Sequence, residues 1–463
     1  METKKKRKFK MPHTYVIIFA IVVLSAILAN IVPAGEFDRI VDAGGNTVVV
    51  ADSFHYLPKI GCGFFEMFVA IQEGFIDGGQ IIFFIIFAYA FVYMLIKNGT
   101  FDAVIGGLLR SVGDRIELII PVCMITFGIL GSTMGLFEET YGLLPIFISI
   151  ACALGYDAIV GSSIVYLGVA VGFAAATINP FTIGVAQEVS GVALFSGIEY
   201  RILCFVVYMA VTLAYVWRYA KKIKAHPEKS ILHGEKLDIL EVGSKEELMS
   251  KEFTFVQKIS CVLFIFTIAM LVYGTVVLKW YINEIAALFI IMMLIIGIIS
   301  KFTPDQIAEY FIEAAKDMMF GALIVGLSRA IPVILENAKI IDTIVYSLSQ
   351  MLMNFQGYLS ALGMLFVQNI INFFIPSGGG QALVTMPILA PVSEMVGLSR
   401  QIAVLAFQFG DGFSNIFWPT SVFMMCGIMR IPVDKWYKFV TPLFGLLFIC
   451  EIILLIGAVA IGY

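Results

Sequence analysis

Long apolar runs recur along the whole chain, and they predict membrane-spanning helices. A run of about 20 apolar residues crosses the hydrocarbon core of a bilayer as an α-helix. Uninterrupted runs of this kind are expected at 14–33, 79–97, 200–219, 254–278, 283–300, 317–335 and 436–462. Stretches with an amphipathic pattern lie between them, at 58–76, 304–316 and 339–356. The short alternating segments that would indicate a membrane β-barrel do not occur.

Two further apolar stretches, 116–154 and 358–396, are each split by a polar, glycine-rich tip. The tips are at 131–135 and 376–381. The arms beside each tip have about 15 residues, which is too few to cross the bilayer. We therefore predict two re-entrant hairpins, each of which enters and leaves the membrane on the same side.

Two more helices, predicted over 158–195 and 400–428, are broken inside the membrane. The first is interrupted at 177–180 and the second within 410–420, where glycines, an Asp, a Ser-Asn pair and a proline replace apolar residues. Glycine and proline break a helix, and each freed backbone group then needs a partner. Secondary transporters use such breaks to build binding sites near the membrane midplane.

The second half of the chain repeats the order of elements in the first half. Gly172 and Gly412 are each followed by Phe, and they are 240 residues apart. The predicted units are a first repeat over 1–219, a hydrophilic linker over 220–253 and a second repeat over 254–463. Counting helices puts the first hairpin on the cytoplasmic side and the second outside, which predicts inverted repeats. A helix count that differs by one would make the repeats parallel. The predicted fold class is an all-α polytopic membrane protein of about nine transmembrane helices, with two hairpins and two broken helices.

Composition and charge agree with this architecture and predict its orientation. Hydrophobic residues make up 60% of the chain and charged residues 14%, whereas a soluble domain has about 25% charged residues. Lys and Arg cluster before the first helix and in the linker, so the positive-inside rule predicts a cytoplasmic N-terminus. We expect a multi-pass protein of the bacterial cytoplasmic membrane. The seven cysteines are scattered without a CxxC, which suggests neither disulfides nor a metal site.

Polar groups at the hairpin tips and helix breaks are the candidate ligands for a substrate. If the repeats pack about a pseudo-twofold axis, all four elements converge, and freed carbonyls and helix ends can bind ions. The predicted substrate-binding residues are Ser132, Thr133, Glu138, Glu139, Asn179, Ser377, Gly378, Gly379, Gln381, Asp411, Ser414, Asn415 and Trp418. The residues predicted near a coupling Na⁺ are Thr177, Asn179, Asp411 and Ser414, and H⁺ is the other candidate ion. The alternative is that the small residues only allow close helix packing.

Three acidic residues, Glu138, Glu139 and Asp411, are predicted at membrane depth, where charges are costly and usually functional. The nearest basic residues, Arg329 and Arg400, are expected at or near helix ends, so the site looks net negative. It suits a cationic or zwitterionic amino acid, or a carboxylate that relays H⁺ or Na⁺. For each glutamate the alternative is snorkelling or pairing with a distant arginine. The aromatic residues expected to form an apolar or cation-π wall are Phe413, Phe417 and Trp418.

Patterns of catalytic residues are not found. The glycine run at 378–380 is not followed by the GK[ST] of a phosphate loop, and there is no Ser-His-Asp arrangement or HExxH motif. We therefore expect a transporter of a small molecule rather than an enzyme, without a cofactor and without nucleic acid as a partner. An ion channel or an intramembrane enzyme is a remote alternative.

At these motifs the chain resembles the YfcC/DcuC-type anaerobic carriers of the ion transporter superfamily. The resemblance rests on GFAAATINPFTIGVAQ at 172–187, PSGGGQ at 376–381 and FGDGFSN at 409–415, and it covers most of the chain. It implies two inverted repeats, each with a hairpin and an unwound helix. It also implies a homodimer in which a transport domain moves like an elevator against a scaffold domain.

The chain departs from one signature of the superfamily. Members with a Ser-Asn-Thr signature use it for carboxylate and Na⁺, but here Ser414 and Asn415 are followed by Ile416, and the first half has Thr-Ile-Asn at 177–179. Family members are assigned to C4-dicarboxylates, short-chain carboxylates and arginine/ornithine exchange. The acidic site favours exchange of basic amino acids by alternating access. The alternative is a C4-dicarboxylate or short-chain carboxylate carrier coupled to Na⁺ or H⁺.

Overall fold

The computed structural model describes residues 12–41, 47–112, 118–235, 237, 253–278 and 280–463. Its helices in the first half are α1 (Thr14–Ile31), α2 (Phe64–Asp77), α3 (Gly79–Lys97), α4 (Thr100–Val112), α5 (Ile119–Met134), α6 (Leu144–Ala153), α7 (Ala158–Ser162), α8 (Gly168–Ala174), α9 (Val185–Val189) and α10 (Ile198–Ala225). Those in the second half are α12 (Phe255–Val276), α13 (Ile282–Ile299), α14 (Pro304–Asn337), α15 (Ile341–Leu352), α16 (Tyr358–Phe374), α17 (Gly378–Met395), α18 (Arg400–Ser414), α19 (Pro419–Met429) and α20 (Val433–Ile461). The all-α membrane fold is confirmed.

Shorter elements complete the chain. The 3-10 turns are η1 (Ala51–Ser53), η3 (Glu138–Leu143) and η6 (Pro227–Lys229), and the π-helical turns are η4 (Ser163–Leu167) and η5 (Pro180–Gly184). Two small antiparallel sheets pair β1 (Gly35–Glu36) with β4 (His55–Tyr56), and β2 (Arg39–Val41) with β3 (Thr47–Val49). They lie beside α15, where Arg39 forms an ion pair with Asp342.

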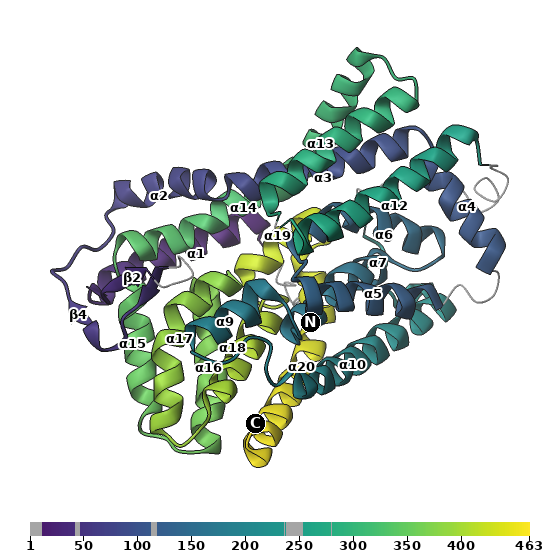
Figure 1. The fold of residues 1–463 in the computed structure, drawn as a ribbon. Coiled ribbons are helices and arrows are strands. Elements are labelled where there is room, and N and C mark those ends of the chain that lie inside the picture. Colours follow the sequence, from purple (N-terminus) through teal and green to yellow (C-terminus); the bar gives the residue numbers. More distant parts are fainter. Residues whose placement is uncertain (1–11, 42–46, 113–117, 236, 238–252, 279) are drawn as a thin grey trace, which may run out of the picture.

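Seven of the described helices are long and apolar enough to cross a membrane: α1, α3, α10, α12, α13, α14 and α20. Together with the shorter helices, these seven helices form two groups (Figure 1). In the first group, which we call the scaffold bundle, α1, α2 and α3 pack against α14, α13 packs on α3, and α12 packs on α13. In the second, the broken-helix bundle, α5–α9 and α16–α19 pack together with α10 and α20. One hydrophobic core of buried side chains extends through both groups.

The two hairpins enter from opposite faces of the molecule. The end of α6 lies beside the end of α10, where Lys224 donates a hydrogen bond to Leu154 O. Nearby on α10, Tyr215 OH donates a hydrogen bond to Phe439 O, near the start of α20. The start of α20 and the start of α1 line the same cavity. We call this face the N-side. The start of α16 meets the end of α17 at the other face, where Gly357 N bonds to Val396 O. The repeats are therefore inverted.

Helix α14 differs from the prediction. An amphipathic piece at 304–316 and a separate helix at 317–335 were expected, but Pro304–Asn337 is one continuous helix of 34 residues. Thr303 and Gln306 form a capping box that starts it, and Pro332 is accommodated inside it. A helix of this length is about 50 Å long, so its first turns extend beyond the bilayer core.

The second helix break is shorter than the sequence indicates. Helix α18 continues through Ser414, and only residues 415–418 separate it from α19. The glycines at 410 and 412 lie inside the helix because they allow close crossings: a Cβ on Gly412 would lie 2.2 Å from Ala174 Cα of α8. Their packing role, which was the alternative interpretation for small residues, holds here. In the first repeat the helix ends at Ala174 and resumes at Pro180, as the sequence predicts.

Candidate functional site

A cavity of about 560 Å³ lies between the two bundles, and both hairpins and both interrupted helices reach it. The hairpin loops and helix breaks contribute Gly135, Phe137, Glu138, Glu139, Tyr141, Phe181, Thr182, Ser377, Gly378, Gly379, Gly380 and Asn415. The scaffold bundle contributes Asp77, Gln80, Tyr281, Ser328 and Arg329. Tyr281, at the start of α13, stands away from the N-side and is half exposed. The cavity therefore extends from the hairpin tips toward the face opposite the N-side.

The carboxylates of the first hairpin line this cavity as predicted. Glu139 is buried, and its Oε2 accepts a hydrogen bond from Phe137 N over 3.0 Å, which holds it against its own loop. Glu138 is less buried and interacts electrostatically with Arg329. Both residues begin η3, the 3-10 turn that follows the tip of the first hairpin.

Arg329 was expected near a helix end, and this prediction was wrong. It lies well inside the continuous helix α14 and lines the cavity. Its Nη1 is 3.5 Å from Asp77 Oδ2. Three carboxylates and one guanidinium therefore line the described cavity, so its balance is still acidic but it contains a cation.

The tip of the second hairpin presents the N-terminus of α17 to the cavity. Ser377 is the N-cap residue, and its hydroxyl accepts a hydrogen bond from Gly380 N. The first N–H groups of a helix have no partner within the helix and carry partial positive charge, so they attract anions. The glycines allow this close approach, because a Cβ on Gly378 would lie 2.6 Å from Thr182 Cγ2.

The sequence predicted Asp411 in the same site as Glu138 and Glu139, and this prediction was wrong. Asp411 is buried behind the second hairpin tip and does not line the cavity. An added Cβ on Gly378 would lie 3.0 Å from Asp411 Oδ2, so the tip separates this carboxylate from the cavity. Asn372 of α16 contacts Asp411 Oδ1 at 3.3 Å and donates to Ser414 Oγ at 2.7 Å. Within the described part of the chain, Asp411 Oδ2 and Asn372 Oδ1 have no hydrogen-bond partner.

Ser132 and Thr177 form a separate cluster at the first break. Ser132 Oγ donates to Ala175 O over 2.9 Å and lies 3.0 Å from Thr177 Oγ1. Arg201 of α10, which is 1% exposed, donates to Thr177 O over 3.1 Å. Thr177 and Asp411 thus belong to different clusters rather than to one ion site.

The freed carbonyl oxygens of the second break are also hydrogen-bonded. Tyr166 OH donates to Asn415 O over 2.9 Å, and Tyr437 OH donates to Phe417 O over 2.8 Å. Asn415 itself faces the cavity, and its amide donates to Asp411 O over 2.7 Å. The carbonyl oxygens of Asn415 and Phe417 are therefore satisfied by protein groups, as hydrocarbon depth requires.

The other predicted site residues have local roles. Thr133 Oγ1 donates to Ile129 O in its own helix, and Trp418 Nε1 donates to Asn369 O of α16. Asn179 accepts from Phe181 N at the start of η5, and its Nδ2 has no partner among the described residues. Gln381 Nε2 donates to Gln368 Oε1 over 2.7 Å and joins the two arms of the second hairpin.

The predicted aromatic wall is not in the cavity. Phe413 is fully buried against Tyr208, and Phe417 stacks on Phe444 with 4.3 Å between ring centroids. The aromatic side chains that do line the cavity are Phe137, Tyr141, Phe173, Phe181 and Tyr281. The prediction failed because the period of a continuous helix through Ser414 turns Phe413 toward α10.

Asn372, whose amide donates to both Asp411 and Ser414, was not among the predicted site residues. Asn372 is 240 residues after Ser132, and both end the first arm of a hairpin, so the repeat spacing could have identified it. Tyr281 and Asp77 offered no such signal, because they reach the cavity from helix ends in the other bundle.

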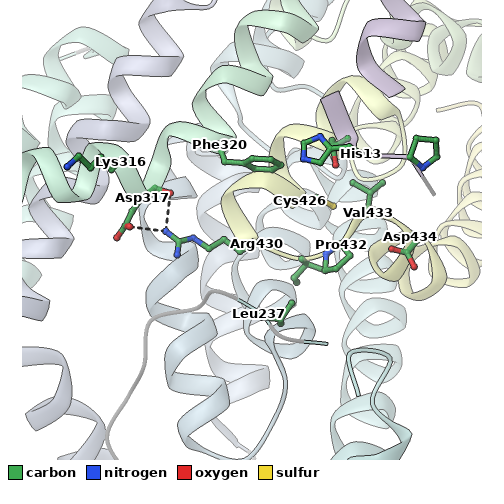
Figure 2. A pocket seen from close by; sticks show the side chains of 13 residues that line it. His13, Leu237, Lys316, Asp317, Phe320, Cys426, Arg430, Pro432, Val433 and Asp434 are labelled. Carbon is green, nitrogen blue, oxygen red and sulfur yellow. Dashed lines mark hydrogen bonds and ion pairs between the residues drawn. The ribbon is translucent and has the colours of Figure 1, made fainter. Parts of the chain in front are cut away.

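A second cavity, of about 530 Å³, lies at the N-side. Figure 2 shows Arg430, at the end of α19, directed toward Asp317 of α14. Arg430 Nη2 lies 3.4 Å from Asp317 Oδ1 and donates to Asp317 O over 3.0 Å. None of the predicted site residues lines this cavity. The ion pair joins the broken-helix bundle to the scaffold bundle on the side away from the central cavity.

Comparisons with known proteins identify the family of the chain. A family model described as "C4-dicarboxylate anaerobic carrier" (DcuC) matches residues 11–460. The chain is 32% identical to the Escherichia coli K12 protein named "Putative basic amino acid antiporter YfcC", over 100% of this chain and 99% of that protein. It is 28% identical to a Haemophilus influenzae protein described as uncharacterized, over 99% of both chains.

Two solved structures also match over nearly the whole chain, at low identity. One is the Neisseria gonorrhoeae efflux pump MtrF, with 19% identity, a TM-score of 0.43, and coverage of 97% of this chain and 95% of that chain. The other is the Alcanivorax borkumensis transporter YdaH, with 13% identity, a TM-score of 0.43, and coverage of 98% and 99%. Because the family model matches residues 11–460 and a relative is 32% identical over the whole chain, this multi-pass membrane protein belongs to the DcuC family of carriers.

Proposed function

We propose that this carrier is a secondary active transporter that exchanges basic amino acids of the arginine/ornithine type across the cytoplasmic membrane. The central cavity is its substrate site. The observation that carries the proposal is the set of charges that described residues place around that cavity: the carboxylates of Asp77, Glu138 and Glu139 and the guanidinium of Arg329. Arg329 pairs with Asp77 and also interacts with Glu138, but one guanidinium cannot neutralise three carboxylates, so negative charge remains to bind a cation.

An amino acid also carries a carboxylate, and the other end of the cavity suits it. The first turn of α17 offers N–H groups at Gly378 and Gly379, and the helix end favours an anion by about 0.3–1 kcal/mol or more. An arginine or ornithine bound with its carboxylate at this turn would direct its basic side chain toward Glu138 and Glu139. A volume of about 560 Å³ accommodates such a molecule.

A C4-dicarboxylate is the second candidate substrate, because Arg329 and the α17 N-terminus are both anion-binding groups in the same cavity. The description of the family model names this class of substrate. Two acidic side chains beside the cavity oppose it, since like charges repel.

We propose that Asp411, Asn372 and Ser414 bind the coupling ion, Na⁺ or H⁺, below the second hairpin tip. Their unpartnered oxygens at Asp411 and Asn372 support this assignment. Binding there would fasten the tip over the substrate, because Gly378 packs directly on Asp411. In this scheme the broken-helix bundle moves as an elevator against the scaffold bundle within a homodimer.

Counterflow in proteoliposomes tests the substrate assignment. Vesicles loaded with arginine should accumulate labelled arginine and ornithine, whereas malate and succinate should give no exchange. The same panel with and without Na⁺ and a pH gradient identifies the coupling ion. Counterflow of succinate without counterflow of either cationic amino acid would contradict the proposal.

A matched pair of variants ties the activity to the cavity. Glu138→Gln removes one cavity carboxylate and should lower arginine exchange by about tenfold or more, as expected for a lost charged hydrogen bond. Glu309→Gln, an exposed change in the first turns of α14, should leave exchange unchanged. Equal activity in both variants would place the substrate elsewhere.

A further inference from the structure

Glu451 of α20 is a buried carboxyl group that the substrate site does not use. It is 1% exposed, and neither of its oxygens has a hydrogen-bond partner among the residues that the structure describes. Its helix is one of those able to cross a membrane. An ionised carboxylate without a partner is very costly away from water, so such a group takes up a proton instead.

The surroundings of Glu451 come mainly from α10, which packs antiparallel to α20. Tyr200 OH bonds to Leu454 O and Tyr215 OH bonds to Phe439 O, which fixes the register of the two helices. Tyr208 lies on the same side of α10 and interacts electrostatically with Glu451. Its hydroxyl is fully buried and also lacks a partner within the described residues.

The charged groups on the packed helices are engaged elsewhere. The guanidinium of Arg201 on α10 is bonded to backbone carbonyls and to Tyr463 OH. On α18, Arg400 pairs with Glu394, and Asp411 contacts Asn372. Besides Glu451, the titratable groups that interact with Tyr208 are the thiols of Cys204 and Cys450 and the phenol of Tyr200. Phenols and thiols are poor ligands for Na⁺, which prefers several hard oxygen ligands, so the proton is the cation that suits this site.

Tyr208 connects Glu451 to the helix that carries Asp411. Its ring packs edge-to-face on Phe409 and Phe413, with centroid distances of 5.3 and 4.6 Å. These two phenylalanines flank Asp411 at a spacing of two residues on α18. A charge that appears at Glu451 would draw water or a donor into this packed layer and shift Tyr208 and α18 with it.

We propose that Glu451 is a proton-binding site inside the broken-helix bundle, protonated in this conformation, whose ionisation displaces α18. The reaction is the binding and release of one proton by the carboxyl group. The site is separate from the substrate cavity, and it goes beyond the exchange function proposed above.

Infrared spectroscopy of the purified full chain in detergent tests the protonation directly. The wild type should show the C=O band of a protonated carboxyl group at neutral pH, and Glu451→Gln should lack that contribution. Glu451→Asp, which keeps an acid, should retain a shifted band. Glu199→Gln at the exposed start of α10 is the matched control and should leave the band unchanged. Identical carboxyl bands in wild type and Glu451→Gln would overturn the proposal.

The pH profile of exchange tests the link to α18. Wild-type exchange should fall at alkaline pH as Glu451 ionises, and Glu451→Gln, which mimics the protonated acid, should lack this fall. Superimposable pH profiles would overturn the proposed effect on α18. The infrared readout needs no substrate, so it distinguishes failure of this proposal from failure of the exchange function.

Discussion

The two interrupted helices follow the same backbone plan, but they satisfy their polar groups in different ways. At the first break, a buried cation from α10, Arg201, holds the carbonyl of Thr177. At the second break, neutral donors such as Tyr166 bond to the carbonyls, and a buried carboxylate, Asp411, is kept beside the break. The first break is thus fastened by positive charge, while the second keeps a negative charge with an unpartnered oxygen within the described chain.

The difference extends to one equivalent position in the repeats. Ser132 ends the first arm of one hairpin and bonds to the first break, while Asn372 ends the first arm of the other and bonds to Asp411 and Ser414. A hydroxyl group can close a short backbone gap, whereas an amide can orient a carboxylate and an additional ligand. Equivalent positions in the two repeats therefore have different roles. The first half has a structural hydrogen-bond cluster, and the second half has a candidate ion site.

The largest expected effect is on transport, from Asp411→Asn. The amide keeps the shape of the side chain but removes the charge that is proposed to bind the coupling ion. Exchange in proteoliposomes should fall on the order of 100-fold, the upper range for losing a charged hydrogen bond. The monodisperse size-exclusion profile should stay unchanged. Asp434→Asn, an exposed change in the first turn of α20, is the control. Exchange at the wild-type rate in Asp411→Asn would show that the second break is only structural.

The next effect is on stability, from Arg201→Gln. This variant loses charged hydrogen bonds to the carbonyls of Thr177, Phe195 and Ser196, and it should destabilise the fold by about 2–4 kcal/mol. A lower melting temperature in detergent would report it. Arg218→Gln, exposed on the same helix, should melt like the wild type. Equal melting temperatures for Arg201→Gln and Arg218→Gln would show that the first break does not depend on the guanidinium of Arg201.

The smallest effect compares neighbouring hydroxyl groups at the first hairpin tip. Ser132→Ala removes the bonds to Ala175 and Thr177 and should cost about 1 kcal/mol of stability. Thr133→Ala should cost less, because its hydroxyl bonds only to Ile129 O within its own helix among described groups. Thermal unfolding of the two variants side by side measures the difference. A larger loss from Thr133→Ala would contradict the assignment of Ser132 to the structural hydrogen-bond cluster.

Much of the site's framework could be predicted from the sequence. The two hairpin tips, the first helix break and the carboxylates at Glu138 and Glu139 were all placed correctly at one cavity or beside it. Which side chains line the central cavity was harder to predict. Asp411 and Phe413 were expected in the cavity, but α18 remains helical through Ser414 and buries both. Glycines at 410 and 412 signal a break in the sequence, whereas in the structure they allow two helices to cross closely.

The sequence alone determined the membrane class, the inverted duplication and the positions where polar residues interrupt apolar runs. These features depend on local hydrophobic length and on the cost of unpaired backbone groups in hydrocarbon, so they can be recognised without long-range contacts. Only the tertiary structure decided which polar groups meet. Arg329 reaches the cavity from the scaffold bundle, Asn372 reaches Asp411 from a hairpin arm, and Glu451 is enclosed by α10. These contacts depend on the relative placement of helices far apart in the chain, which the packing of the helices sets and no local pattern encodes.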